Sequence, residues 1–492
     1  MQNRSIGHHH AILRLSLPVA LVVGSVWLFS LVSVLTVDAR SDSTAQRVVV
    51  IGRESPAADT YSYTAFLPFL WRSVTDPVYG PWGVQMYDQL DASRGFDFAT
   101  AGGVRWIRLR VSWFEIESIN TTPAFYNWSA LDQTMLAAGF NGINLVVTLE
   151  GNPSWAAPTI YGPVNNLNDL KEFVGAVVER YPQVRYWELY NEPDNMYHFG
   201  ARGGTYATHL NAVYPVIKSA NPSAQLVMGG IALDWFTTEG GGFDPNFVND
   251  MLQACVAPCF DVANFHYYPL FRARWNAQGR DIIGKANAFR QMLAARGYIR
   301  PMLSTETGWV YQTNPGGDWG GPDIQGRYVP KAMIRGQAAN LVMTNWYALT
   351  DADPTLPGLL GGAQPFQIRP SYTAMKRLIT QLKAAQFERA LTSGEMGHPD
   401  LEGYRYSQTT VAGNTERIDV TWYDCRGLVV GTGSLPVDCL NAAAYDVPAS
   451  QVTVYDHLNG SGVVYTDGND GVLDGKVKLF INRNPVYIHY TP

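Results

Sequence analysis

The sequence has few charged residues and contains no run of lysine or arginine. Charged residues make up 16% of the 492 positions, against about 25% in an average soluble domain. The net charge is −6, so we expect no nucleic-acid partner. Aromatic residues, by contrast, reach 12%, with 14 Trp and 27 Tyr. This surplus excludes a mostly disordered chain and favours a partner with flat, weakly polar faces, of which carbohydrate is one.

Cysteine is also scarce, with four residues in the whole chain. They form two local pairs, Cys255 with Cys259 and Cys425 with Cys439. An even count is typical of an exported protein with disulfides, and four buried free thiols are the alternative. No histidine or second cysteine pair has the spacing of a zinc finger, so no metal or cofactor is expected.

The long uncharged run of the sequence lies near the N-terminus, over residues 15–37. It is long enough to cross a bilayer as a helix, and Arg4 and Arg14 before it place the rest of the chain outside the cell. A cleaved signal peptide is the alternative, and it also exports the chain. Residues 1–40 are therefore predicted to be a membrane anchor or signal segment, followed by a Ser/Thr/Ala-rich linker over 41–80. The expected location is the extracellular face of the membrane or the secreted fraction.

Residues 81–385 alternate short β-rich runs with helical patterns. The predicted strands are 83–87, 106–111, 145–149, 186–190, 225–228, 262–266, 302–306 and 341–347. The clearest predicted helix begins near Asn168, and its apolar face comprises Leu170, Phe173, Val174, Val177 and Val178. Another helix follows the eighth strand, and its apolar face comprises Ala374, Leu378, Ile379 and Leu382. Eight such units fit a closed (β/α)8 TIM barrel. An open doubly wound sheet would need a glycine-rich phosphate turn, which residues 80–83 do not supply.

Residues 386–492 have a different pattern, with short alternating strands separated by Gly, Asn and Asp turns. The predicted strands are 417–422, 451–455, 476–481 and 486–490. The pattern predicts a C-terminal antiparallel β domain of sandwich type, and it contains no catalytic cluster. The predicted fold class is therefore α/β, with this β domain and an N-terminal hydrophobic helix added to the barrel.

Two glutamates carry the strongest chemical signal. The motif WELYNEPD (187–194) ends the fourth predicted strand, and LSTETGW (303–309) ends the seventh. Strand C-termini form the active face of a barrel, so Glu192 and Glu306 should face each other there, as glycoside hydrolysis requires. Glu188 shares the parity of Glu192 but lies four residues deeper, so we expect it to be a buried, paired carboxylate.

These motifs resemble clan A of the glycoside hydrolases, and within it families 39 and 5, over residues 81–385. The resemblance implies a retaining mechanism, with Glu192 as acid and base and Glu306 as nucleophile. Their carboxyl groups should then lie about 5 to 5.5 Å apart, and the charge of Glu306 should raise the pKa of Glu192.

The resemblance also implies a set of supporting residues. They are Asn191, Arg108, Arg110, Trp155, His266, Tyr268, Trp309 and Trp346. Asn191 would bond the 2-hydroxyl of the sugar, and Tyr268 with one arginine would orient Glu306. Many relatives carry a small, polar or acidic residue at the position of Arg110, so the choice between Arg108 and Arg110 stays open. Trp309 and Trp346 could present exposed faces to sugar rings or belong to the core.

The sequence thus predicts an exported, retaining O-glycoside hydrolase that acts on a β-linked oligo- or polysaccharide. A non-catalytic, membrane-tethered carbohydrate-binding protein is the alternative. An anchored structural protein would leave the two glutamates unaccounted for.

Overall fold

A computed structural model describes residues 80–256, 258–309, 321–351, 356–424 and 440–492. The predicted anchor or signal segment (1–40), the linker apart from Gly80, and the Cys425–Cys439 pair lie outside these ranges. Within them, no helix combines the length and the apolar character that crossing a membrane requires.

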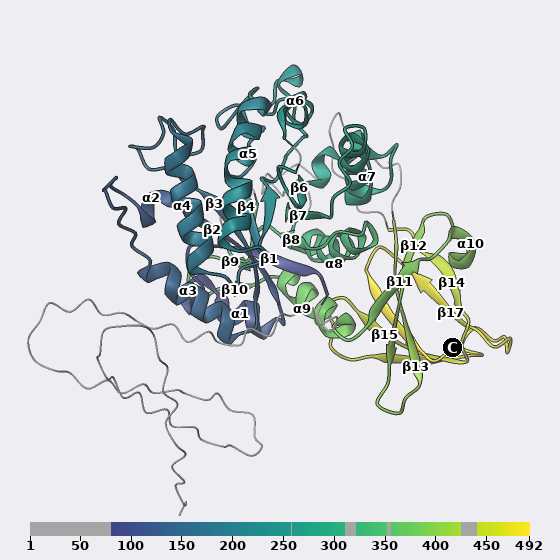
Figure 1. Cartoon of the computed structure of the whole chain (residues 1–492). Coiled ribbons are helices and arrows are strands. Elements are labelled where there is room, and N and C mark those ends of the chain that lie inside the picture. The colour runs from purple at the N-terminus through teal and green to yellow at the C-terminus, as the bar shows by residue number, and fades with distance from the viewer. Residues whose placement is uncertain (1–79, 257, 310–320, 352–355, 425–439) are drawn as a thin grey trace, which may run out of the picture. The chain divides into compact units, whose positions relative to one another are not determined.

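The centre of the fold is a sheet of eight parallel strands in the order β5-β4-β3-β2-β1-β8-β7-β6 (Figure 1). The strands are β1 (Trp82–Tyr87), β2 (Trp106–Ser112), β3 (Asn144–Glu150), β4 (Tyr186–Leu189), β5 (Gln225–Met228), β6 (Ala263–Tyr267), β7 (Met302–Thr307) and β8 (Thr344–Trp346). A parallel bridge between Val227 and Val262 joins the two edges, so the sheet closes into a (β/α)8 barrel. Each of the eight predicted strands is confirmed within a few residues.

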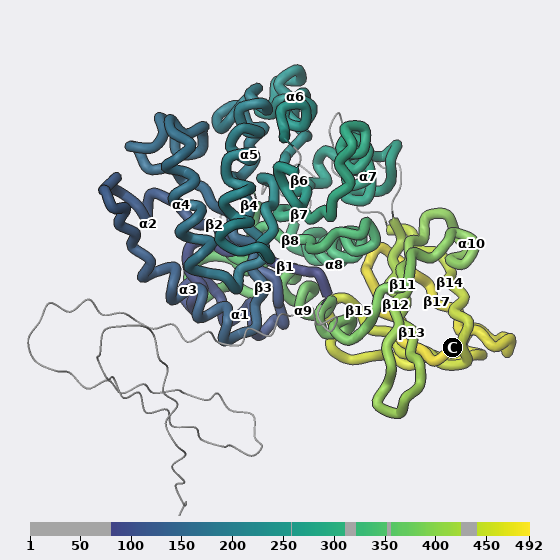
Figure 2. The backbone as a smooth tube through the Cα atoms, viewed as in Figure 1, coloured from purple at the N-terminus to yellow at the C-terminus, as the bar shows by residue number. Residues whose placement is uncertain are grey.

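Helices lie around the strands (Figure 2). They are α1 (Phe96–Ala101), α2 (Trp113–Ile116), α3 (Ser129–Phe140), α4 (Leu167–Arg180), α5 (Gly203–Ala220), α6 (Phe247–Ala254), α7 (Asp281–Ala294), α8 (Pro322–Ala338) and α9 (Pro370–Leu382), with 3-10 turns at Ala92–Arg94, Thr237–Glu239 and Pro269–Trp275. The predicted apolar faces of α4 and α9 are buried. The predicted cap was wrong by two residues: Asn166 caps α4, and its side chain accepts a hydrogen bond from the backbone N–H of Asn168.

The C-terminal part is antiparallel, as predicted. Its larger sheet has the order β11-β12-β13-β18-β15-β16, and β14 pairs with β17. The elements are β11 (Gln386–Ala390), α10 (Ser393–Met396), β12 (Leu401–Thr409), β13 (Thr415–Tyr423), β14 (Ala443–Val447), β15 (Gln451–Asp456), β16 (Val463–Thr466), β17 (Val477–Ile481) and β18 (Val486–Tyr490); a small β9 (Leu360–Gly361) and β10 (Gln367–Ile368) ladder precedes α9. The prediction found β13, β15, β17 and β18 and missed the other four.

A buried ionic cluster joins the barrel to the β domain. Arg335 of α8 donates hydrogen bonds to both carboxylate oxygens of Glu402 on β12, at 2.9 and 2.6 Å. It also contacts Asp281 at the start of α7 and Asp424 after β13. Trp422 of β13 belongs to the same apolar cluster as the barrel core. One face of the β domain therefore packs into the barrel core, and the rest of the domain has a core cluster of its own.

Candidate active site

Arg108 occupies the centre of a polar layer inside the barrel. Alternate residues of β2 point inward, so Arg108 and Arg110 lie in successive layers. The Arg108 side chain is fully buried. Its Nε donates to Glu188 Oε2 at 2.7 Å and its Nη2 to Glu188 Oε1 at 2.8 Å. Its Nη1 donates to Glu306 at 2.6 Å and its Nη2 also to Asn191 Oδ1 at 2.7 Å.

Glu188 is a buried partner of Arg108. It also accepts hydrogen bonds from Thr148 and from the backbone N–H of Gly230. Burial is the largest influence and would raise its pKa, but the charge and hydrogen bonds of Arg108, together with His266 and Thr148, lower it overall. Glu188 is thus the buried, paired carboxylate that its depth predicts, and Glu192 is the more exposed of the two.

Both oxygens of Glu306, at the end of β7, accept hydrogen bonds. Arg108 Nη1 donates to Oε1 at 2.6 Å, and the Tyr268 hydroxyl donates to Oε2 at 2.9 Å. These two donors hold the carboxylate in a fixed orientation. Of the two candidate arginines, Arg108 is the one in direct contact with Glu306.

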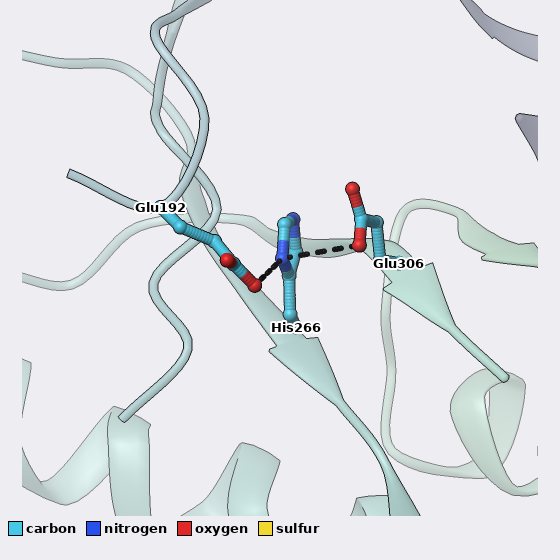
Figure 3. Close-up of side chains that lie close together, drawn as sticks. All are labelled: Glu192, His266 and Glu306. Atoms are coloured by element: carbon cyan, nitrogen blue, oxygen red, sulfur yellow. Dashed lines mark hydrogen bonds and ion pairs between the residues drawn. The ribbon is translucent and has the colours of Figure 1, made fainter. Parts of the chain in front are cut away.

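Glu192 lies opposite, on the segment that follows β4. The backbone turns sharply there, with positive φ at Tyr190 (61°) and at Glu192 itself (41°). The Glu192 side chain is 20% exposed, and its Oε1 lies 2.9 Å from His266 Nδ1. The same nitrogen lies 3.5 Å from Glu306 Oε2, so His266 stands between the two carboxylates (Figure 3). One oxygen of each carboxylate and this nitrogen all lie within 4.8 Å of one another.

Burial sets the protonation of this group. It raises the pKa of Glu192, and the electrostatic interactions with His198 and Arg108, the largest opposing ones, offset this only in part. The expected cause, the charge of Glu306, is not among the leading ones. Burial also lowers the pKa of His266 to about 4, so the imidazole is neutral near pH 7. A neutral His266 can hydrogen-bond Glu192 but supplies no charge to hold it ionised.

The converging Glu192, His266 and Glu306 are close enough to ligate a small cation. Their hydrogen bonds argue for another use. Arg108 and Tyr268 already bind both oxygens of Glu306, and Thr305 lies 3.1 Å from the second nitrogen of His266. A cation here would compete with the Arg108 guanidinium for Glu306, so the donor set fits a carboxylate pair better than a metal centre.

Arg110 lies one layer nearer the mouth than Arg108 and has a partner that sequence reasoning missed. Its Nε donates to Glu150 Oε1 at the end of β3 at 2.5 Å, and its guanidinium lies 5.6 Å from the ring centroid of Tyr87. The Tyr87 hydroxyl in turn donates to the Tyr347 hydroxyl at 2.5 Å. The inward parity of Glu150 on β3 was the signal that could have found it.

Of the two alternatives for Trp309 and Trp346, exposed ring faces or burial in the core, the structure has the second. Both side chains are buried in the core cluster. Tyr328 of α8 packs between them, with ring centroids 4.8 Å from Trp309 and 6.3 Å from Trp346, so α8 covers the rings. Trp155 is half-buried, lies edge-on to Trp113, and donates a hydrogen bond to the Glu117 carbonyl.

The predicted cysteine pair within the described residues is a disulfide. Cys255 and Cys259 are joined in the connection between α6 and β6. It contributes no group to the carboxylate pair.

No protein-family model matches the sequence, and a search of curated proteins finds no relative. Solved structures do share the fold. A family 39 glycoside hydrolase from Bacteroides cellulosilyticus WH2 is 20% identical, with a TM-score of 0.62 and coverage of 84% of this chain and 81% of that one. A monomeric β-xylosidase from Caulobacter crescentus CB15 is 13% identical (TM-score 0.55; 84% and 96% covered).

A family 30 endoxylanase from Clostridium papyrosolvens C71 is 12% identical (TM-score 0.53; 84% and 97% covered). All three structures are glycoside hydrolases, and their coverage extends beyond the barrel into the β domain. At these identities the comparison establishes architecture. The chain therefore shares the fold of clan A glycoside hydrolases, in agreement with the resemblance of its motifs.

Proposed function

We propose that this chain is a retaining O-glycoside hydrolase. The observation that carries the proposal is the approach of the Glu192 and Glu306 carboxylates to within 4.8 Å across His266. An inverting enzyme needs about 6.5–9.5 Å between its carboxyl groups to admit the attacking water. The separation here favours direct attack by one carboxylate.

The two environments assign the two roles. Arg108 and Tyr268 each donate a hydrogen bond to Glu306 and orient its carboxylate, so we assign Glu306 as the nucleophile. Its oxygen forms a bond to the anomeric carbon while the glycosidic C–O bond breaks. Glu192, whose pKa burial raises, gives its proton to the leaving oxygen. In the second step Glu192 takes a proton from water, whose oxygen displaces Glu306 from the anomeric carbon.

Asn191 supports the proposal of a retaining glycoside hydrolase. Its Oδ1 accepts from Arg108 Nη2, which orients the amide. Within the described ranges the amide nitrogen has no hydrogen-bond acceptor, so it is available to a sugar hydroxyl. A bond to the 2-hydroxyl strengthens as the oxocarbenium-like transition state forms.

The proposed substrate class is a β-linked oligo- or polysaccharide. This class fits the motif resemblance and the fold shared with enzymes named as xylosidase and xylanase. A carbohydrate-binding protein without turnover is the second candidate. The hydrogen-bonded Glu306 and the raised pKa of Glu192 argue against it, because binding alone needs neither.

Export is part of the proposal. The uncharged run over 15–37 and the Cys255–Cys259 disulfide support it, because disulfides persist in oxidising compartments. Cell fractionation should find the full-length chain in the membrane fraction, or a chain without its N-terminal segment in the secreted fraction. Full-length protein in the cytosol would contradict export.

Two variants test the catalytic roles. Glu306→Ala should lose all turnover of aryl β-glycosides, because the nucleophile is gone. Glu192→Ala should keep turnover of substrates with activated leaving groups, and azide should accelerate it. Glu172→Ala, on the exposed face of α4, is the matched control and should retain wild-type activity. Binding of glycans by a wild type that turns over no member of a β-glycoside panel would favour the carbohydrate-binding alternative.

A further inference from the structure

Large aromatic and apolar side chains are exposed on the two loops beside Glu192. Trp235, after β5, is 52% exposed, and Tyr197, after β4, is 86% exposed. The exposed part of the Trp235 side chain is not packed in the core, and an aromatic ring face suits contact with a sugar ring.

The loop that carries Trp235 is bound directly to the segment that carries Glu192. The Asp194 carboxylate accepts hydrogen bonds from the backbone N–H groups of Ala232 and Leu233, at 3.2 and 2.8 Å. Further along, Met196 N–H donates to the Gly242 carbonyl at 2.8 Å, and Phe243 N–H donates to the Trp235 carbonyl at 3.1 Å. The two loops therefore form one hydrogen-bonded unit next to the acid.

The residues on either side of Trp235 are fixed in place. Asp234 accepts from the buried Lys285 at 2.6 Å and from the indole N–H of Trp275 at 2.9 Å. Arg274 lies over the ring of Phe236, 4.3 Å from its centroid. Trp235 itself packs on the backbone of Gly241, where an added Cβ would lie 2.5 Å from its Cγ. An exposed ring on so rigid a support loses little entropy when a ligand stacks on it.

The chemistry of the acid decides which part of a substrate this surface meets. The nucleophile contacts the anomeric carbon of the sugar that is retained, whereas the acid contacts the glycosidic oxygen, beyond which lies the leaving group. Loops bound to the Glu192 segment therefore flank the leaving-group side.

We infer that Trp235, with Tyr197 beside it, forms a stacking platform for a sugar on the leaving-group side of the scissile bond. This inference rests on the proposed function and narrows it. The substrate is a saccharide whose leaving group is itself a sugar, and a small aglycone leaves the platform unused.

The test compares two kinds of substrate with the same retained sugar. The probes are β-glycosyl fluorides and β-1,4-linked tetrasaccharides of glucose, xylose and mannose. Fluoride is too small to reach the platform. The measured quantity is kcat/KM for the tetrasaccharide divided by kcat/KM for the fluoride. This ratio should fall about tenfold in Trp235→Ala, because one stacked ring strengthens binding on the order of tenfold. Trp235→Phe should recover most of the ratio.

Phe140→Ala is the matched control. Phe140 is another exposed aromatic (69%), but it ends α3 and so lies at the opposite end of the barrel. Its substitution should leave the ratio unchanged. Calorimetric binding of the tetrasaccharides to Glu192→Gln provides a readout that needs no turnover, and adding Trp235→Ala should weaken binding about tenfold.

The outcomes separate the platform from the proposed activity. Fluoride hydrolysis with equal ratios in wild type and Trp235→Ala would overturn the platform and leave the activity standing. Tetrasaccharide binding that depends on Trp235, without hydrolysis of any fluoride, would support the platform and contradict the activity. Failure of every tetrasaccharide to bind would also overturn the platform.

Discussion

Replacement of Arg108 by methionine should be the most destabilising single change at the base of the active site. Arg108 is fully buried between two carboxylates, Glu188 and Glu306. Methionine fills much of the same volume but leaves both carboxylates without their cation. Breaking a buried ion pair costs about 3–5 kcal/mol, so we expect the free energy of unfolding to fall by about 4 kcal/mol.

A second arginine provides the comparison. Arg110 has one carboxylate partner, Glu150, and its side chain is 17% exposed. Arg110→Met should cost about 1.5–3 kcal/mol, the range for a hydrogen bond to a charged group. Adding Glu188→Gln to Arg108→Met should recover about 2 kcal/mol, because the double variant no longer buries the uncompensated Glu188 charge.

Urea unfolding followed by tryptophan fluorescence measures these free energies. Wild type, Arg108→Met, Glu188→Gln and the double variant form a double-mutant cycle, and Arg110→Met is the control. Equal losses for Arg108→Met and Arg110→Met, or no recovery in the double variant, would refute the view that Arg108 neutralises the buried carboxylates. Arg108→Lys adds a functional readout: lysine keeps the charge and loses the planar fork, so kcat/KM should fall on the order of 100-fold.

Three further predictions concern pH, the domain junction and metal ions. Because burial raises the pKa of Glu192, kcat/KM should fall as the pH rises through that pKa. This fall should be absent when Glu192→Ala acts on a glycosyl fluoride. The same pH profile in Glu192→Ala as in wild type would argue against Glu192 as the acid. Burial opposes ionisation of Glu402, yet Arg335 lowers its pKa to about 2. Glu402→Gln should therefore cost about 3–5 kcal/mol at pH 7, and the difference in urea unfolding from wild type should shrink as the pH falls from about 4 towards 2. Activity should survive EDTA, and a loss that divalent cations restore would contradict the hydrogen-bonded carboxylate pair.

The barrel was predictable because its signals are local and repeat. Buried strands alternate with helices whose apolar spacing is plain in segments such as α4 (Leu167–Arg180), and the order of the strands around the barrel then follows from chain order. The convergence of Glu192 and Glu306 was predictable for the same reason, because the C-terminal ends of barrel strands meet at one face.

Contacts between distant strands were harder to predict. Nothing near Arg110 in the sequence indicates that Glu150 will hold it, since that pairing depends on how β2 and β3 align. The burial of Trp309 and Trp346 depends on Tyr328 of α8, which covers them. In the β domain, β16 (Val463–Thr466) is short, largely exposed and close to glycine-rich turns, so its pattern is weak without its partner strand.

The stereochemistry of hydrolysis tests the central claim most directly. A proton NMR time course on wild-type enzyme with a β-glycoside that it cleaves reports the configuration of the first sugar released, before mutarotation. Direct attack by Glu306, with Glu192 as acid and then base, predicts the β-anomer as first product. The α-anomer as first product would mean that water attacks the anomeric carbon directly, and would contradict the assignment of Glu306 as nucleophile.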